Sequence, residues 1–312
     1  MALHELPLER KNLHGHFSRD LPPAVTIDPG DSVTFFVPDA GWGIGPPIDD
    51  TATREHFEPR DKELDAGHAL LGPIEVRGAR AGGTLAVHLE ELRVGTWGVT
   101  EAGGWSTPLN ERLGVADGET RSLVWRLDPE AGTGRDQFGR EVDLRPFLGV
   151  IGMPPPEPGL HWTSPPRRWG GNIDCSELVQ GATLYLPIPV DGALLSAGDG
   201  HARQGDGEVS QLAIEAPMER ACLTVSLADF ELENPIARID GAWLTFGVDE
   251  DLDEAAAQAV DGMLALMHRE LGLERRDALA LASVVVDLRV TQLVNGVQGI
   301  HALLRDDAIR AK

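Results

Sequence analysis

The chain contains few of the residues on which several enzyme classes depend. Its 312 residues include only two cysteines, Cys175 and Cys222, which cannot form a disulfide framework and are typical of a reducing compartment. Its three lysines, Lys11, Lys62 and Lys312, all stand in polar or terminal contexts. Amidases with a Ser-Ser-Lys arrangement and nitrilases need a catalytic lysine, so both schemes are disfavoured.

Long apolar runs and an excess of positive charge are also missing. No segment approaches the ~18 apolar residues that span a bilayer, and residues 1–13 contain no continuous apolar run of signal-peptide length. Asp plus Glu number 50 against 27 Lys plus Arg, and the formal net charge of -23 opposes binding to nucleic acid or anionic membrane. The sequence therefore predicts a cytoplasmic protein with a small neutral or cationic substrate and with neither nucleic-acid nor membrane partners.

Short β-rich runs separated by turn residues dominate the first two thirds of the chain. We expect hairpins over residues 24–37, where Asp-Pro-Gly-Asp separates two runs, and over residues 74–89. Residues 95–120 and 129–142 are Gly-rich and polar, so they are expected to form loops over the sheet edge. Residues 148–153 are a candidate buried strand.

The last third changes to helical periodicity. Asp251 and Glu254 fit a capping box, apolar residues follow at spacings of three and four, and Gly272 ends the run. We expect a second helix over 275–285 and a strand over 288–297.

These patterns predict an α+β fold, with a β-rich body built from hairpins, sandwich-like or barrel-like, and C-terminal helices packed on it. Residues 1–150 would form the N-terminal β-rich part. Residues 151–312 would contain the catalytic region, the helices and the final strand, all within one compact unit.

Residues 196–208, Ser-Ala-Gly-Asp-Gly-His-Ala-Arg-Gln-Gly-Asp-Gly-Glu, combine glycines with four side chains that can bind a metal or move a proton. In extended backbone Asp199 and His201 would share one face, and so would Asp206 and Glu208. The glycines would let the backbone turn tightly so that both pairs converge. The same pattern is also typical of two solvated hairpin bends, which is the alternative interpretation.

Metal-assisted hydrolysis needs only residue types that are present. A divalent ion lowers the pKa of bound water from 15.7 toward ~7, and a nearby carboxylate can accept the water proton and pass it to the leaving group. Oxygen-rich ligation with one histidine suits zinc, manganese or calcium. Cys175 could be a nucleophile, but a lone cysteine is more often a small buried hydrophobe.

The candidate residues follow from this scheme. Glu208 is the expected general base, Gly171 and Asn172 could place N–H donors on the oxyanion, and His68 is a further ligand or orients the substrate. The full set is Asp174, Asp199, His201 and His68 for the metal, Glu208, Asp206 and Asn172 for catalysis, and Gly171 and Gln204 for the substrate or oxyanion.

Several motifs together resemble the acetamidase/formamidase family over about residues 24–303. They are Gly170-Gly-Asn-Ile-Asp, the stretch 181–208, Ile214-Glu, Gly67-His-Ala-Leu-Leu-Gly-Pro, Leu148-Gly-Val-Ile-Gly and Val286-Asp-Leu-Arg-Val-Thr-Gln-Leu-Val-Asn. The resemblance implies hydrolysis of formamide or acetamide to ammonia and a carboxylate, a compact β-rich fold with added helices, and a metal in at least some members, zinc being our first expectation. It also implies assembly as a homodimer or higher homo-oligomer.

The sequence thus predicts a metal-dependent amidohydrolase of short linear amides. Two alternatives stay open at this point. One is hydrolysis of an ester or other carbonyl compound by the same ion, and the other is a non-catalytic metal-binding protein.

Overall fold

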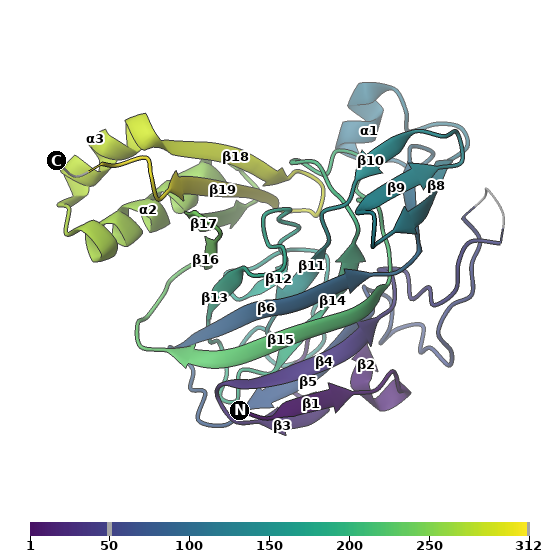
Figure 1. Ribbon diagram of the computed structural model, residues 1–312, viewed down its shortest axis with the longest axis horizontal. Helices are drawn as coiled ribbons and strands as arrows, with labels where there is room; N and C mark the ends of the chain where they lie inside the picture. Colours follow the sequence, from purple (N-terminus) through teal and green to yellow (C-terminus); the bar gives the residue numbers. More distant parts are fainter. Residues whose placement is uncertain (49–51, 311–312) are drawn as a thin grey trace.

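The structure is a computed structural model that describes residues 1–48 and 52–310, so Lys312 lies outside the described residues. Its strands form three sheets within these ranges, two large and one small (Figure 1). The nine-stranded sheet has the order β1 (Leu3–Leu6), β4 (Asp31–Val37), β15 (Met218–Ala228), β6 (Thr84–Val94), β13 (Thr183–Pro187), β16 (Ile236–Ile239), β17 (Ala242–Asp249), β19 (Gln298–Arg305) and β18 (Val286–Gln292).

The six-stranded sheet contains β12 (Gly170–Asn172), β11 (Phe147–Gly152), β14 (Leu195–His201), β5 (Leu70–Val76) and β2 (Leu13–His14), with β3 (Val25–Ile27) paired to β5. The small sheet has the order β10 (Glu141–Asp143), β9 (Thr133–Asp136), β8 (Arg121–Asp128) and β7 (Trp97–Ala102). The helices are η1 (Arg10–Asn12), α1 (Pro108–Leu113), α2 (Leu252–Leu271) and α3 (Arg275–Val285).

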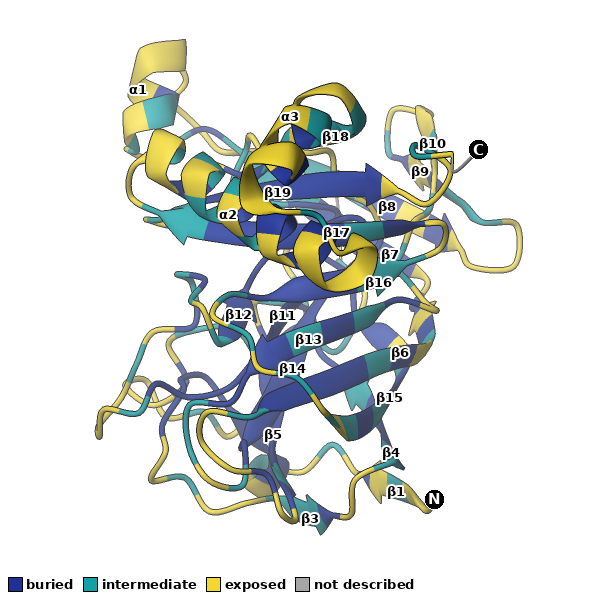
Figure 2. Cartoon of the chain, turned by 90° about the vertical axis from the view of Figure 1, so that its left-hand side faces the viewer, coloured by how far each residue is buried: buried dark blue, intermediate teal, exposed yellow. Residues whose placement is uncertain are grey.

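One hydrophobic core joins the two large sheets. Val33, Val87 and Leu223 of the nine-stranded sheet belong to the same buried cluster as Ile74 and Leu148 of the six-stranded sheet. Figure 2 shows these strands as buried and the outer faces of α2 and α3 as exposed. The predicted β-rich body with packed helices is confirmed, but the barrel-like alternative is wrong, because β1 and β18 are end strands and the sheets stay open.

Both expected hairpins are wrong. β3 and β4 are joined by the predicted turn, yet β3 pairs with β5 in one sheet and β4 pairs with β1 and β15 in the other. β5 and β6 are likewise separated between the two sheets. The turn residues mark a reversal of the chain, but the two strands that the turn joins belong to different sheets, so the reversal crosses from one layer to the other.

The loops expected over residues 95–120 and 129–142 are also wrong, because these residues form β7, α1, β9 and β10. β7 and β9 pair with β8, and β10 pairs with β9. In β8, Trp125 and Leu127 alternate with more exposed residues and reach the main core. The glycines that suggested loops serve the turns of this small sheet, for example Gly103 with φ 67° and Gly132 with φ 68°.

The C-terminal helices lie on the nine-stranded sheet (Figure 1). Asp251 caps α2 by accepting from the N–H of Asp253, and Gly272 ends the helix with φ 67°. The N–H of Asp251 donates to Asp249 and not to Glu254, so the reciprocal half of the capping box does not form. α2 packs on β17 and β19, and α3 packs against α2. The buried cluster they share includes Ala255, Ala259, Met263, Met267, Ala278 and Ala282 with Ile300 and Ala302.

The final strand expected over residues 288–297 is replaced by two strands. β18 ends at Gln292, the chain turns through Gly296 with φ 81°, and β19 returns antiparallel to β18. In the described ranges, none of the helices has both the length and the apolarity to cross a bilayer. The division at residue 150 stays a prediction, and strands from both sides of that residue alternate in the nine-stranded sheet.

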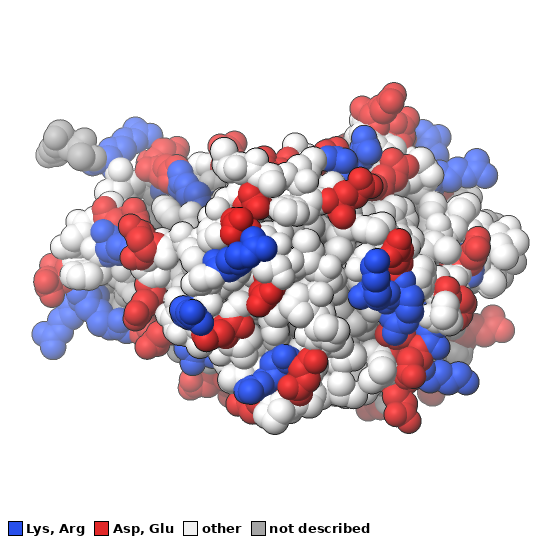
Figure 3. Space-filling model, turned by 90° about the horizontal axis from the view of Figure 1, so that it is seen from below, with Lys and Arg blue, Asp and Glu red and all other residues white. Residues whose placement is uncertain are grey.

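Charged side chains of both signs are mixed on the surface. On the face shown in Figure 3, Lys and Arg side chains lie among Asp and Glu side chains in small groups. This mixture is typical of a solvated surface, as the spread of acidic residues along the sequence predicts.

Substitution of Met263 tests whether the packing of α2 on the nine-stranded sheet stabilises the fold. Met263→Ala should lower the free energy of unfolding by about 2–5 kcal/mol, because the fully buried side chain leaves a cavity under the helix. Urea unfolding measures the change. Glu254→Ala, an exposed position on the same helix, is the control and should change stability by less than about 0.5 kcal/mol. Equal effects of the two substitutions would contradict this packing.

Candidate active site

Strand β14 brings an acid and an imidazole together. Nε2 of His201 lies 3.1 Å from Oδ1 of Asp199 and 3.3 Å from Oε1 of Glu215. The shared face of Asp199 and His201 is therefore observed, and all three residues are buried. The glycines between them do not serve turns: a Cβ at Gly198 or Gly200 would overlap with a backbone carbonyl oxygen of a neighbouring segment.

Two further carboxylates complete the cluster. Ligand atoms of Asp174, Asp199 and His201 lie within 4.8 Å of one another, and so do those of His201, Glu208 and Glu215. Asp174 and Glu208 are only 1% and 5% exposed, although both follow glycine-rich loops. We call Asp174, Asp199, His201, Glu208 and Glu215 the acid–histidine centre.

The expected pairing of Asp206 with Glu208 is wrong. Glu208 has φ 46°, so the backbone here is not extended and the two side chains do not share a face. Asp206 instead pairs with Arg289, with 2.6 Å between Oδ2 and the guanidinium, and accepts from the hydroxyl of Ser176 at 3.2 Å. Its side chain is 28% exposed, outside the acid–histidine centre.

Glu215 belongs to the Ile214-Glu motif, but the reasoning from sequence gave it no role in the site. It is a single acidic residue in an otherwise apolar run, Ala213-Ile-Glu-Ala-Pro-Met, and its position is fixed by bridges to Val99 and His201. Its Oε1 also accepts from the N–H of Ala213 at 2.9 Å. A lone carboxylate in an apolar run is the signal that could have found it, because a buried acid needs a partner.

Gly149 of β11 forms the floor of the centre. A Cβ at this position would overlap with Oδ2 of Asp199 and Oδ1 of Asp174 and would lie 2.9 Å from Cε1 of His201. Only glycine leaves the carboxylates room to converge. This glycine is part of the motif Leu148-Gly-Val-Ile-Gly, but the reasoning from sequence gives it no role in the site.

The donor atoms fit a divalent cation. In the part of the chain that the structure describes, four buried atoms of the centre have no hydrogen-bond partner: Oδ1 of Asp174, Nδ1 of His201, Oε2 of Glu208 and Oε2 of Glu215. Buried charged groups are normally paired or coordinate metals. A set of carboxylate oxygens with one imidazole nitrogen is a ligand set for zinc, manganese or calcium.

Burial and mutual repulsion shift the pKa values of the carboxylates. Burial, and next the charge of Asp199, raise the pKa of Asp174 to about 8, and burial raises the pKa of Glu215 to about 7. Burial and the charge of Asp174 raise the pKa of Glu208 well above its usual range. Burial opposes the charge on His201, but Asp199 and Glu215 outweigh it and raise the pKa of the imidazole. Negative charge is thus in excess here, which favours a cation.

His68 lies beside the centre and not within the two groups of ligand atoms. Its Nδ1 is 2.7 Å from Oγ1 of Thr163, which also accepts from the backbone N–H of His68 at 3.0 Å. Burial lowers the pKa of His68, and the charge of Asp199 acts in the opposite direction. The position suits a neutral imidazole that faces a substrate.

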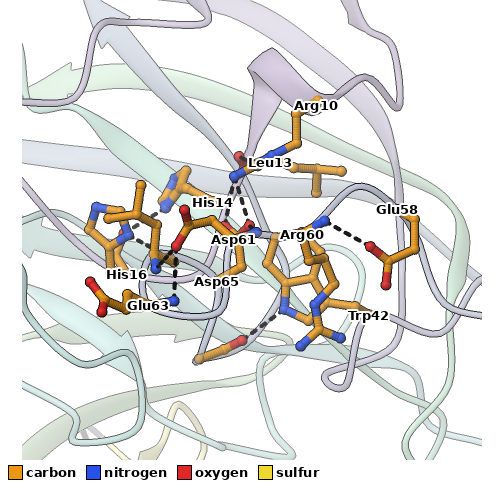
Figure 4. A network of polar contacts seen from close by, with 12 residues as sticks. Arg10, Leu13, His14, His16, Trp42, Glu58, Arg60, Asp61, Glu63 and Asp65 are labelled. Atoms are coloured by element: carbon orange, nitrogen blue, oxygen red, sulfur yellow. Dashed lines mark hydrogen bonds and ion pairs between the residues drawn. The ribbon is translucent and has the colours of Figure 1, made fainter.

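A polar network holds the loop that leads to His68 (Figure 4). Arg10 donates to both carboxylate oxygens of Asp65 at 2.9 and 2.7 Å, and Asp65 also accepts from the N–H of Asp61 at 2.7 Å. The indole N–H of Trp42 donates to the carbonyl of Gly67 at 2.8 Å. The N-terminal segment therefore fixes the loop that leads to His68.

The remaining candidates surround the centre. Asn172 and Gly171 lie on β12, paired with Val150 and Ile151 of β11, and Gln204 donates to the backbone carbonyl of Asp174 at 2.8 Å. Burial raises the pKa of the Cys175 thiol to about 12, so this residue behaves as the small buried hydrophobe and not as a thiolate nucleophile.

A β-rich sandwich with a buried acid–histidine centre defines the class of protein, and comparisons with known proteins identify the family. The chain belongs to the Acetamidase/Formamidase family, whose profile matches residues 3–161 and 159–303. The acetamidase of Mycolicibacterium smegmatis is 24% identical over 293 residues, which cover 75% of this chain and 68% of that protein. The chain is therefore an amidohydrolase acting on linear amides, as the sequence predicts.

Two solved structures share the fold. The acetamidase of Bacillus halodurans is 28% identical with a TM-score of 0.82, covering 96% of this chain and 97% of that one. A predicted acetamidase/formamidase of Thermoanaerobacter tengcongensis is 27% identical with a TM-score of 0.82, covering 97% of this chain and 96% of that one.

Gly149 provides a test of the geometry. Gly149→Ala should lower amide hydrolysis about 100-fold or more, because the added methyl group pushes Asp174 and Asp199 apart. Ammonia release measures the loss. Gly205→Ala is the matched control, since a Cβ there meets no atom within 4 Å, and it should keep full activity. Full activity of Gly149→Ala would show that the two carboxylates are not needed at this spacing.

His14 belongs to the network of Figure 4, and its buried imidazole should make the folded protein less stable in acid. Burial lowers its pKa from 6.5 to about 3, so below pH 6.5 the unfolded chain binds a proton that the folded chain does not. From this group the free energy of unfolding should fall by up to about 1.4 kcal/mol per unit between pH 6.5 and 3.

Urea unfolding at pH 7, 6 and 5 measures this slope. His14→Gln removes the titrating group and should flatten the profile by the same amount. An identical slope in the variant would rule out His14 as its source.

Proposed function

We propose that the protein hydrolyses a short linear amide, such as formamide or acetamide, to ammonia and a carboxylate in a reaction that depends on a divalent metal, with zinc the first expectation. The observation that supports it most directly is the convergence of four buried carboxylates and one imidazole in the acid–histidine centre. Its ligand atoms form two groups of three within 4.8 Å, and four of its buried atoms have no hydrogen-bond partner among the described residues. The names of the related acetamidases and formamidases agree with this substrate class.

In this proposal Asp174, Asp199 and His201 hold the cation. When bound, such an ion polarises a carbonyl oxygen and lowers the pKa of coordinated water. Their donor atoms lie close enough to share one ion, and Gly149 leaves the space between the carboxylates open. Glu215 orients His201 through the 3.3 Å contact with Nε2 and offers a further oxygen.

Glu208 is our choice of general base. Its Oε2 is buried, and among the described residues it has no hydrogen-bond partner, so it is available to accept a proton from water and deliver it to the leaving nitrogen. His68 would orient the amide. Gly171 and Asn172 would supply donors to the oxyanion from β12.

Asp206 and Gln204 would support this arrangement from outside the centre. Gln204 fixes the backbone of Asp174, and Asp206 anchors the segment that leads to Glu208 by its ion pair with Arg289. Cytoplasmic location and assembly as a homodimer or higher homo-oligomer also stay predictions.

The roles of Asp199 and Glu208 can be separated by two variants. Asp199→Ala should lose both bound metal and ammonia release from formamide and acetamide, because it removes a ligand. Glu208→Gln should keep the metal but lower the rate of ammonia release about 100-fold or more, because the side-chain amide of glutamine cannot accept the proton from water. Elemental analysis and an ammonia assay measure the two properties.

Glu219→Gln, an exposed position on β15, is the control for the glutamate substitution and should behave as the wild type. Ammonia release unchanged in both site variants would contradict the roles assigned to Asp199 and Glu208.

Turnover of an ester panel without turnover of amides would favour the carbonyl-hydrolase alternative. Folding that depends on metal, without any turnover, would favour the non-catalytic metal-binding alternative.

A further inference from the structure

Asn295 reaches the acid–histidine centre from the far end of the chain. It lies in the turn between β18 and β19, and its Nδ2 donates to Oδ2 of Asp174 at 2.6 Å. The other oxygen of that carboxylate, Oδ1, faces the position of Gly149 together with Oδ2 of Asp199. Asn295 therefore distinguishes the two oxygens, because one is held by an amide and the other points into the centre.

The turn that presents Asn295 is built by a buried side chain. Gln292 is 0% exposed, and its Oε1 accepts from the N–H groups of Val294 at 2.8 Å and Asn295 at 3.2 Å. Its Nε2 donates to the carbonyl of Val297 at 2.9 Å. One glutamine thus bridges the whole turn, so the Asn295 side chain is presented from a fixed backbone.

The same turn also supports the segment that carries Glu208. The N–H of Gly207 donates to the carbonyl of Thr291 at 3.0 Å, and the N–H of Leu293 donates to the carbonyl of Gly207 at 3.1 Å. The C-terminal hairpin consequently contacts both Asp174 and the residue next to Glu208. These two acids, 34 positions apart in sequence, share one support.

We propose that Asn295 is a positioning residue for metal binding, which holds Asp174 so that Oδ1 is presented to the cation. This inference rests on the proposed function, in which Asp174 is a ligand. Ligating carboxylates are usually fixed by outer hydrogen bonds, and loss of such a partner typically weakens metal binding 10–100-fold. An amide suits the position because it donates to the carboxylate without adding a further negative charge.

The test is a Co²⁺ titration of the chelator-treated full-length protein, followed by its visible absorption, which reports both affinity and ligand geometry. Asn295→Ala should weaken Co²⁺ binding about 10–100-fold and alter the spectrum. Leucine has a branched side chain like that of asparagine but no side-chain hydrogen-bond donor, so Asn295→Leu should show the same change. It serves as the second variant if Asn295→Ala folds poorly. Circular dichroism checks folding.

Gln298→Ala is the matched control, since Gln298 belongs to the same hairpin and its side chain donates to the carbonyl of Glu250 at 3.2 Å, away from Asp174. It should bind Co²⁺ as the wild type does. If a folded Asn295 variant binds Co²⁺ with wild-type affinity and an unchanged spectrum, this inference is overturned. The proposed function is then unaffected, provided that the wild type hydrolyses amides. A wild type that neither binds Co²⁺ nor releases ammonia would instead overturn the proposed function, and this inference with it.

Discussion

The repulsion among carboxylates that share one buried space is the constraint on which the site depends. Four acids of the acid–histidine centre lie out of water, where unpaired charges are costly, and His201 is their one imidazole partner within the group. A fold that keeps them together must either protonate some of them or supply positive charge. The raised pKa values of Asp174 and Glu208 correspond to protonation, and the carboxylate oxygens that converge at Gly149 suit a cation.

Backbone strain accompanies this crowding. Asp174, Asp199 and Glu208 have φ values of 52°, 61° and 46°, a left-handed conformation that few residues other than glycine adopt. Such conformations cost about 1–3 kcal/mol each and persist where the surrounding structure holds them. Here the surroundings are strand pairs of β11 with β12 and β14, together with the turn around Gln292. The sheet thus supports strained backbone at three residues of the acid–histidine centre.

The parts of this structure that sequence predicts are those determined by local spacing. Asp199 and His201 meet on one side of β14, as their spacing of two predicts, although Asp199 has φ 61°, and α2 begins and ends where Asp251 and Gly272 mark it. The pairing of strands could not be predicted, because turn chemistry shows where the chain reverses but not which strand it will join. The predicted hairpins therefore divided between two sheets.

Residues that act across long sequence distances were missed for the same reason. Gly149, Glu215 and Asn295 stand in motifs that resemble the family, but their roles in the site come only from the neighbours that folding brings to them. Asp206 shows the opposite error, since it stands in a motif rich in chemistry but its carboxylate serves Arg289.

The order of strands in the nine-stranded sheet also affects biosynthesis. β4 and β6 are made early, but the strand that lies between them, β15, begins only at Met218. Until the ribosome has delivered that strand, the nascent chain exposes two open strand edges that could pair wrongly. Because the edges of β4 and β6 stay unpaired until β15 is synthesised, the nascent chain should benefit from a chaperone that covers these edges during translation.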